Sequence, residues 1–480
     1  LNLFHLLQTA SHNSIGLDAG IPARGWTGEG YQGHIFWDEL FIFPTLNYRI
    51  PEITRSLLMY RYQRLGEARA AAKNAGFQGA MFPWQSGSDG QEQTEKVNLN
   101  PRSQRWVPDN SYLQRHVSSA IAYNVWQYFQ ITHDLEFLQF YGAELILEIA
   151  RFWSSIATFN QERGRYEIRG VMGPDEFHEG YPNSATPGLN NNAYTNVMAV
   201  WVLWRALEVL DLLPEIRRAE LTGFLGLSAE EIARWDDISR RMYLPFHSDG
   251  LISQFEGYEE LAELDWEHYR ASYGNIQRLD LILEAENDSA NRYKLSKQAD
   301  VLMLFYLFSA DELGGLFKRL GYPFEYEMIP RNVSYYGSRS SNGSTLSRVV
   351  HAWVLARSDW LRSMEYFEQA LQSDLSDIQQ GTTAEGIHLG AMAGTLDLVQ
   401  RVLMGIEVTG DVLRLNPQLP QEVNRFEMRM RYRGHSLDLQ LTSNLLIVRD
   451  RDHGAAPITL QIGKQIHSCA GGSTHVFNLG

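Results

Sequence analysis

Cysteine is almost absent from this sequence. Cys469 is the single cysteine among 480 residues, so the chain can form no internal disulfide. This is compatible with a reducing compartment, and we expect a cytoplasmic protein. Long apolar runs are also missing, which argues against a membrane-spanning helix. Acidic residues outnumber basic ones, giving a formal net charge of −15. Such a surface repels phosphate backbones and anionic lipids, so we expect neither nucleic acid nor a membrane as a partner.

Several catalytic signatures are missing as well. The sequence contains no H-E-x-x-H and no cysteine cluster, which argues against a zinc site. It contains no G-x-S-x-G of a serine hydrolase and no G-x-x-x-x-G-K-[ST] of a phosphate-binding loop. We therefore expect neither a metal nor an organic cofactor.

The remaining composition is that of a globular protein, with 44% hydrophobic and 21% charged residues. This length allows one large domain or two to three smaller ones. The chain begins with Leu1 rather than methionine, and its first residues already have the pattern of packed structure. We therefore expect a fragment or a processed chain.

Most of residues 50–405 has the pattern of helices. Pro51 is suited to the first turn of one helix, and Asp134 can cap another. Residues 191–213 are apolar on nearly all sides, which is typical of a helix in an inner layer. Further helices are predicted at about 229–242, 297–320, 345–371 and 386–404.

The pattern changes after Gly410. Apolar and polar residues alternate over 426–432, 437–441 and 458–462, which predicts antiparallel strands with one solvated face. We therefore predict a helical domain over 1–409 and a small β-domain over 410–480. Long polar segments at 77–108, 158–192 and 321–344 separate the helices, and segments of this length usually carry function.

Acids, amides and tryptophans gather in five clusters. Carboxylates and amides can hydrogen-bond sugar hydroxyls while tryptophan covers the ring, and cleavage of a glycosidic bond needs a protonated carboxylic acid at the leaving oxygen. From the residues alone this indicates a sugar site, with a non-catalytic sugar-binding protein as the alternative. The clusters are G-H-I-F-W-D-E at 33–39, F-P-W-Q-S-G-S-D-G-Q-E at 82–92, G-P-D-E-F-H-E at 173–179, K-Q-A-D at 297–300, and the pair S-S-N-G-S-T-L-S at 340–347 and G-T-T-A-E-G-I-H at 381–388.

Five motifs in this order resemble glycoside hydrolase family 65, which includes maltose, trehalose and kojibiose phosphorylases and related hydrolases. They are G-H-I-F-W-D, G-P-D-E-F-H, N-N-A-Y-T-N, K-Q-A-D-V and G-T-T-A-E-G-I-H-L-G-A-M-A-G. The resemblance runs from about residue 5 to the C-terminus. It implies an (α/α)6 barrel followed by a C-terminal β-sandwich, which agrees with the patterns above. The large N-terminal β-sandwich usual in the family has no counterpart here. The family tends to dimerise, so a homodimer is a further expectation.

The resemblance also implies roles for single residues. Glu176, the glutamate of G-P-D-E, would be the general acid, and Asp175 and Glu179 would favour its protonated form by like-charge repulsion. The resemblance places Trp37 and Asp38 at the hydroxyls of the non-reducing glucose, with Lys297 and Gln298 beside them. From its cluster alone, Trp84 is a further candidate for binding the sugar.

Two routes remain open for the second reactant. A hydrolase needs a second carboxylate as base, whereas a phosphorylase needs a cradle for inorganic phosphate made of N–H groups, hydroxyls and a histidine. Between Ile329 and Ser363 the only acid is Asp359, and this is the region where hydrolases of the family place their base. Glu385 is the base candidate if water is the nucleophile. The candidate phosphate ligands are Gly343, Ser344, Thr345, Thr382, Thr383 and His388, although serine and threonine before a helix are more often caps.

Asn342-Gly343 stands where the family often has His-Asp, which bears on the phosphate contacts and on the choice of leaving sugar.

We hypothesise an inverting phosphorylase that converts an α-linked glucosyl disaccharide, of trehalose or maltose type, and inorganic phosphate to β-glucose 1-phosphate and a free sugar. An inverting α-glucoside hydrolase is the alternative.

Overall fold

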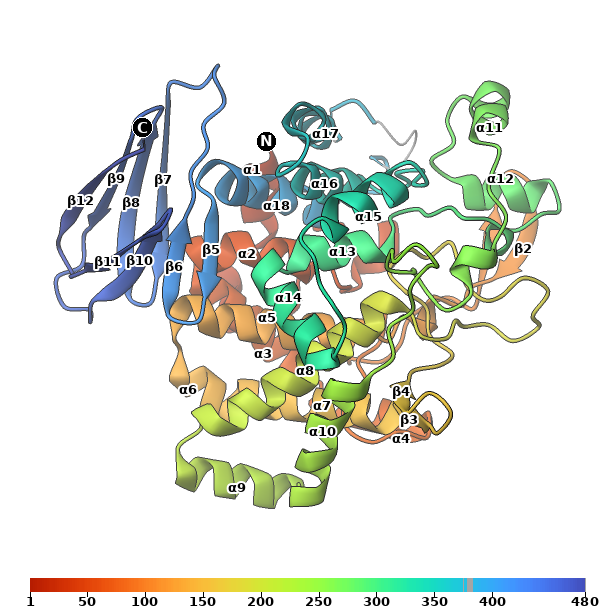
Figure 1. Ribbon diagram of the computed structural model, residues 1–480, viewed down its shortest axis with the longest axis horizontal. Coiled ribbons are helices and arrows are strands. Elements are labelled where there is room, and N and C mark those ends of the chain that lie inside the picture. Colours follow the sequence, from red (N-terminus) through yellow and green to blue (C-terminus); the bar gives the residue numbers. More distant parts are fainter. Residues whose placement is uncertain (374, 378–382, 480) are drawn as a thin grey trace.

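A closed ring of inner helices forms the centre of the computed structural model, which describes residues 1–373, 375–377 and 383–479 (Figure 1). Each inner helix contacts the next, and the last returns to the first. They are Glu39–Arg49 (α2), Val117–Thr132 (α5), Ala193–Leu212 (α8), Asp300–Leu307 (α13), Thr345–Leu355 (α16) and Leu389–Leu398 (α18). The apolar composition of these segments explains their place, because a helix that is apolar on all sides is stable only when it is buried on all sides.

An outer layer packs on this ring and completes an (α/α)6 barrel. Helix α1 packs on α18, α3 on α2 and α5, α7 on α5 and α8, α10 on α8, α15 on α13 and α16, and α17 on α16 and α18. The helices outside the ring are Asn2–Thr9 (α1), Pro51–Gln63 (α3), Leu65–Asn74 (α4), Leu135–Phe137 (α6), Ala143–Ile156 (α7), Glu215–Leu225 (α9), Ala229–Arg241 (α10), Trp266–Tyr273 (α11), Leu279–Ala285 (α12), Ala310–Leu320 (α14), Met328–Gly337 (α15) and Trp360–Gln372 (α17).

Two long predicted helices are each divided in two. The segment 297–320 breaks before α14, where the side chain of Ser309 accepts from the Glu312 N–H at 3.2 Å. The segment 345–371 breaks before α17, where Asp359 accepts from the Arg362 N–H at 3.1 Å. Both residues are favoured helix caps, so a new helix begins at each of them and the chain turns back between the inner and outer layers.

The long polar segments contain more regular structure than expected. Segment 321–344 includes α15, and the other two each hold a short antiparallel hairpin. The hairpin strands are Val97–Asn100 (β1) with Arg105–Pro108 (β2), and Thr158–Asn160 (β3) with Arg165–Glu167 (β4).

The C-terminal part is a β-sandwich of two four-stranded sheets. The strand orders are β11-β10-β6-β5 and β12-β9-β8-β7. Alternate residues of β8 are buried, as the period-two pattern predicted. The first strand begins at Ile406, shortly before the expected domain boundary. The strands are Ile406–Thr409 (β5), Val412–Leu415 (β6), Arg425–Tyr432 (β7), His435–Thr442 (β8), Leu445–Asp450 (β9), Ile458–Ile462 (β10), Gln465–Cys469 (β11) and Thr474–Asn478 (β12).

The sandwich packs against one end of the barrel, at the left in Figure 1. Tyr48 of α2 and Ile131 of α5 belong to the hydrophobic core of the sandwich. Arg433 follows β7, and its Nε donates to the carbonyl oxygen of Gln130 at 3.1 Å. The sandwich therefore covers the C-terminal ends of inner helices, and their N-terminal ends face the opposite side.

In the described part of the chain, no helix is both long enough and apolar enough to cross a membrane. The cytoplasmic location stays a prediction.

Candidate active site

The motif residues lie at the N-terminal ends of the inner helices. Asp38 precedes α2, Asn192 caps α8, Asp300 opens α13, Thr345 opens α16 and His388 precedes α18. The N-terminus of a helix carries unpaired N–H groups and a partial positive charge. Several such ends directed to one place favour an anion there.

Glu176 lies on the loop between β4 and α8, directly after a Gly-Pro turn. Its backbone has a φ of 65°, in the left-handed region that residues other than glycine seldom adopt and that is found often at functional sites. Glu176 Oε2 lies 2.5 Å from Lys297 Nζ, and the two side chains are 31% and 21% exposed. Burial lowers the pKa of Lys297, but the Glu176 carboxylate, together with Tyr31, acts in the opposite direction and leaves that pKa above its ordinary value. The carboxyl group is therefore both accessible and oriented.

Asp175, the neighbour of Glu176, is buried and fully occupied by hydrogen bonds. Its Oδ1 accepts from the Lys297 backbone N–H at 2.6 Å, and its Oδ2 accepts from Gln254 Nε2 at 3.0 Å. His178 Nδ1 lies 2.9 Å from the same Oδ2. Because charged groups are seldom buried without partners, this arrangement indicates that Asp175 holds the loop in place.

Both ring nitrogens of His178 face hydrogen-bond acceptors. Its Nε2 donates to the carbonyl oxygen of Tyr293 at 3.0 Å, and its Nδ1 faces the Asp175 carboxylate. The ring therefore ties the Glu176 loop to the segment after α12.

Asp300 links the Glu176 loop to Asn192, the cap of α8. Its Oδ1 accepts from the Asp175 N–H at 2.7 Å, and its Oδ2 accepts from Asn192 Nδ2 at 2.6 Å. Burial, reinforced by the charge of Asp175, raises the pKa of Asp300 well above its ordinary value. A Cβ on Gly173 would lie 1.9 Å from Asp300 Oδ2, so the start of G-P-D-E can approach Asp300 this closely only as glycine.

A second chain of contacts joins the residues expected at the sugar to those expected at phosphate. His388 Nε2 lies 2.7 Å from Asp38 Oδ1, and His388 Nδ1 lies 2.7 Å from Thr345 Oγ1. Burial lowers the pKa of His388, although the Asp38 carboxylate acts in the opposite direction. Thr345 is thus held at the entrance of α16 by a histidine that is itself held by Asp38.

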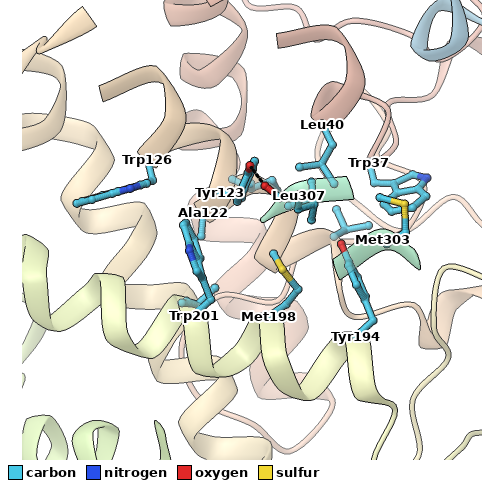
Figure 2. Close-up of a cluster of buried hydrophobic side chains, with 14 of the residues drawn as sticks. Trp37, Leu40, Ala122, Tyr123, Trp126, Tyr194, Met198, Trp201, Met303 and Leu307 are labelled. Carbon is cyan, nitrogen blue, oxygen red and sulfur yellow. Dashed lines mark hydrogen bonds between the residues drawn. The ribbon is translucent and has the colours of Figure 1, made fainter. Parts of the chain in front are cut away.

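The two tryptophans line the inner wall of this end of the barrel. The rings of Trp37 and Trp84 are 6.3 Å apart, and both side chains are buried. The His116 ring lies 5.1 Å from Trp37 and 5.5 Å from Trp84. Burial lowers the pKa of His116 to about 3, so this ring is neutral. Figure 2 shows Trp37 beside Met303, at the same end of the core as Tyr194.

The 340–347 loop packs directly on Lys297. The Gly343 N–H and the Ser347 hydroxyl each donate to the Lys297 carbonyl oxygen at 3.3 Å. Ser344 caps α16 and accepts from the Leu346 N–H at 3.2 Å. The proposed phosphate loop is therefore anchored to the residue that pairs with Glu176.

The remaining predicted residues have different surroundings. Gln298 is buried, and its Nε2 donates to Met303 Sδ at 2.9 Å. The Thr383 N–H donates to Asp377 Oδ1 at 3.3 Å. Thr382 lies outside the described residues.

Glu385, the base candidate, is the most exposed acid of the site. Its side chain is 57% exposed, and Oε2 lies 3.6 Å from Arg24 Nη2. Its carbonyl oxygen accepts from the Gly30 N–H at 2.7 Å. A Cβ on Gly28 would lie 2.4 Å from the same oxygen, so this loop packs tightly on the segment before α2.

Gln254 and Asn192 lie beside the site and were given no role from the sequence. Gln254 bridges Asp175 Oδ2 and the Asp300 N–H, and no motif marks it. Burial raises the pKa of Glu179 to about 7, although a hydrogen bond from Asn110 opposes the shift. Asn192 could have been found, because it belongs to N-N-A-Y-T-N.

The described residues contain no group of three or more His, Cys, Asp or Glu side chains arranged to hold a metal ion.

Comparison with known families gives two adjoining matches. Residues 1–397 match the model of the glycosyl hydrolase family 65 central catalytic domain, and residues 406–468 match that of the family 65 C-terminal domain. A solved structure described as a putative kojibiose phosphorylase from the human microbiome superposes with a TM-score of 0.81 at 24% identity, covering 100% of this chain and 64% of that one. At this identity the superposition supports the fold alone.

Curated relatives are longer than this chain. An uncharacterized glycosyl hydrolase of Mycobacterium tuberculosis is 58% identical over 461 residues, which are 96% of this chain and 35% of the relative. Trehalose 6-phosphate phosphorylase of Lactococcus lactis is 40% identical over 93% of this chain and 57% of its own length. Kojibiose phosphorylase of Caldanaerobacter subterraneus is 34% identical over 93% of this chain and 56% of its own length. This chain therefore spans between about a third and somewhat over half of the length of these relatives.

Proposed function

Since this chain belongs to glycosyl hydrolase family 65, we propose that it catalyses the inverting phosphorolysis of an α-linked glucosyl disaccharide, of trehalose or maltose type. The products are β-glucose 1-phosphate and a free sugar. Phosphorylases of such α-glucosides among the curated relatives support the reaction class.

The observation that carries this proposal is a partly exposed glutamate, Glu176, paired with Lys297 beside a cluster of helix N-termini. Glu176 is the acid, and the ends of α16 and α18 with Thr345 and His388 form the anion cradle. The other carboxylates at the centre are already engaged as acceptors, because Asp175 and Asp300 hold the loop and Asp38 holds His388. A phosphorylase needs no second free carboxylate, since phosphate is itself an anionic nucleophile.

The proposed reaction follows from this arrangement. Glu176 gives its proton to the glycosidic oxygen as the bond from that oxygen to the anomeric carbon breaks. A phosphate oxygen attacks the same carbon from the opposite face, which inverts its configuration. The proton that hydrogen phosphate gives up restores the acid. Lys297, next to Glu176 in the free enzyme, stabilises the carboxylate that remains after proton transfer.

The test measures glucose 1-phosphate released from trehalose, maltose, kojibiose and nigerose with and without inorganic phosphate. We expect phosphate-dependent release of the β-anomer, identified by proton NMR. Glu176→Gln should lower the rate at least ~10²-fold, the lower end of the usual contribution of a general acid. Glu385→Gln is the matched control and should retain activity. Free glucose produced equally well without phosphate, and lost in Glu385→Gln, would instead establish hydrolysis with Glu385 as base.

The surroundings of Arg278 favour a leaving sugar that carries a phosphate group. Arg278 lies on the loop before α12, and its side chain is half-exposed and paired with Asp280 at 2.7 Å. The residue before it, Gln277, accepts from the Ser341 hydroxyl at 3.1 Å through its carbonyl oxygen, so Arg278 lies beside the 340–347 loop. A guanidinium beside this loop suits a leaving sugar that carries a phosphate, as in the substrate named for the Lactococcus lactis relative.

This variation is tested by comparing trehalose with trehalose 6-phosphate. If Arg278 binds the sugar phosphate, Arg278→Gln lowers kcat/KM for trehalose 6-phosphate at least tenfold more than for trehalose. Arg292→Gln is the control, because Arg292 also pairs with an aspartate, Asp288. An equal effect of Arg278→Gln on both sugars would exclude this role.

A further inference from the structure

A cavity lies at the end of the barrel opposite to Glu176. Its volume is about 470 Å³, within the range of small-molecule sites. It lies between the C-terminal ends of inner helices and strand β5 of the sandwich. Its walls include Asn47 of α2, Gln127 of α5, Tyr306 of α13, Trp353 of α16 and Asp397 of α18.

A layer of packed side chains separates this cavity from the active site. Tyr123 and Leu307 are part of its walls on the side of the Trp37 end of the core, and the Tyr123 hydroxyl donates to the Leu307 carbonyl oxygen at 2.9 Å (Figure 2). Leu40, one helical turn after Trp37, lines the cavity. The cavity is therefore a separate compartment and not an extension of the sugar site.

The cavity walls contain buried polar groups without partners. Asn47 is 0% exposed, and within the described residues neither its Oδ1 nor its Nδ2 has a hydrogen-bond partner. The same holds for the hydroxyl of Tyr306, which is 1% exposed. Buried polar atoms are nearly always paired, with the protein, with water or with a ligand. The Asn47 amide and the Tyr306 hydroxyl, each able to donate and to accept, are thus available to an occupant.

The charge of the walls restricts the chemistry of this occupant. Asp397 is paired with Arg401 at 3.5 Å, and Arg401 Nη2 also donates to the Tyr306 carbonyl oxygen at 2.7 Å. The ends of the inner helices at the cavity are C-terminal and carry partial negative charge, whereas the N-terminal ends of α14 and α17 also line it. The lining has a formal net charge of −2, from Asp311, Glu312, Asp397 and Glu407 against Arg357 and Arg401. Burial raises the pKa of Glu312 and Asp397 above the ordinary carboxylate value.

We propose that this cavity is a second binding site for a neutral sugar of one or two rings. An amide that both donates and accepts, a phenolic hydroxyl and several aromatic side chains match the hydroxyls and apolar faces of a sugar. The available volume fits that size, and the excess of acidic over basic side chains in the walls favours a neutral sugar over inorganic phosphate or a sugar phosphate. The proposal concerns a site apart from Glu176 and holds whichever reaction occurs there.

The test is calorimetric titration of the whole chain with glucose and with trehalose. Wild type should show two binding events for at least one of the two sugars. Asn47→Leu, which keeps the side-chain size, should weaken one event at least tenfold and leave catalytic rates unchanged. Tyr306→Phe should weaken the same event at least threefold. Asp38→Asn, the matched variant at the catalytic end, should weaken only the other event.

Three other results would contradict the proposal. If Asn47→Leu is folded, as judged by its thermal midpoint, and binds both sugars like wild type, the proposal is wrong. A single binding event in wild type that is lost in Asp38→Asn would mean that the cavity holds only water. Inorganic phosphate is the chemical control, and its binding should be the same in Asn47→Leu and wild type. A loss of phosphate binding in that variant would overturn the assignment of a neutral ligand.

Discussion

Replacing Asp175 by asparagine tests whether the buried network positions Glu176. The substitution keeps the shape of the side chain but removes its charge. One oxygen can still accept a hydrogen bond from Lys297 N–H or from Gln254, while the new NH2 group must face other donors. We therefore expect the loss of about two charge-assisted hydrogen bonds, including the one with His178.

The magnitude follows from these contacts. A hydrogen bond to a charged group contributes about 1.5–3 kcal/mol, and part of this is kept by the neutral amide. We expect Asp175→Asn to lower the free energy of unfolding by about 2–4 kcal/mol, measured by urea denaturation. Displacement of Glu176 by about 1 Å should lower kcat of phosphate-dependent cleavage ~10²-fold with little change in KM.

The sandwich offers a matched control for this variant. His435 and Asp450 form a similar buried pair: Nδ1 lies 2.5 Å from Asp450 Oδ2, and Nε2 donates to the Ala456 carbonyl oxygen at 2.8 Å. Asp450→Asn should cost comparable stability and leave kcat unchanged. If Asp175→Asn loses stability to the same extent as Asp450→Asn yet retains wild-type kcat, the network is merely structural and the positioning argument is refuted.

Two further predictions concern the same loop. Gly173→Ala should lower kcat/KM at least ~10²-fold and the free energy of unfolding by about 1–3 kcal/mol, because the new Cβ must displace Asp300. Gly223→Ala is the control, since the added atom there meets nothing within 4 Å. A Gly173→Ala variant with wild-type activity would contradict the tight packing. Burial raises the pKa of Glu179 to about 7 from an ordinary value of 4.5, so between these values the folded state binds more protons than the unfolded state and stability falls as pH rises. Relative to Glu179→Gln, the thermal midpoint of wild type should therefore fall between about pH 5 and 7 and stay lower above it, and parallel curves for the two proteins would exclude the shift.

Local patterns predicted much of the fold. The all-round apolar segment 191–213 corresponds to α8, and the alternating residues after Gly410 correspond to strands of the sandwich. These features depend on neighbours close in sequence, which is why they could be predicted. The division of 297–320 had a local signal, because Ser309 is a favoured cap residue. Whether a new helix begins there also depends on how the inner and outer helical layers pack.

The sequence predicted which residues belong to the candidate site but not which of them contact one another. The motif K-Q-A-D drew attention to Lys297, yet only the fold brings its Nζ to Glu176. Likewise, His388 and Asp38 are 350 positions apart and meet because α18 and α2 close the ring. The role of Gln254 was not predictable, because one glutamine on a loop carries no periodic or motif signal.

The sequence by itself determined the helical body, the β-tail and the loops that bear the chemistry, since capping, periodicity and turn preferences act over a few residues. Only the tertiary structure decided which carboxyl group stays accessible. Asp175 and Glu176 are adjacent acids of similar chemistry. One is buried under hydrogen bonds from Lys297 N–H and Gln254, and the other is partly exposed beside Lys297 Nζ. That difference arises from the closure of the helical ring, which places distant donors around one carboxylate and leaves the next one open to substrate.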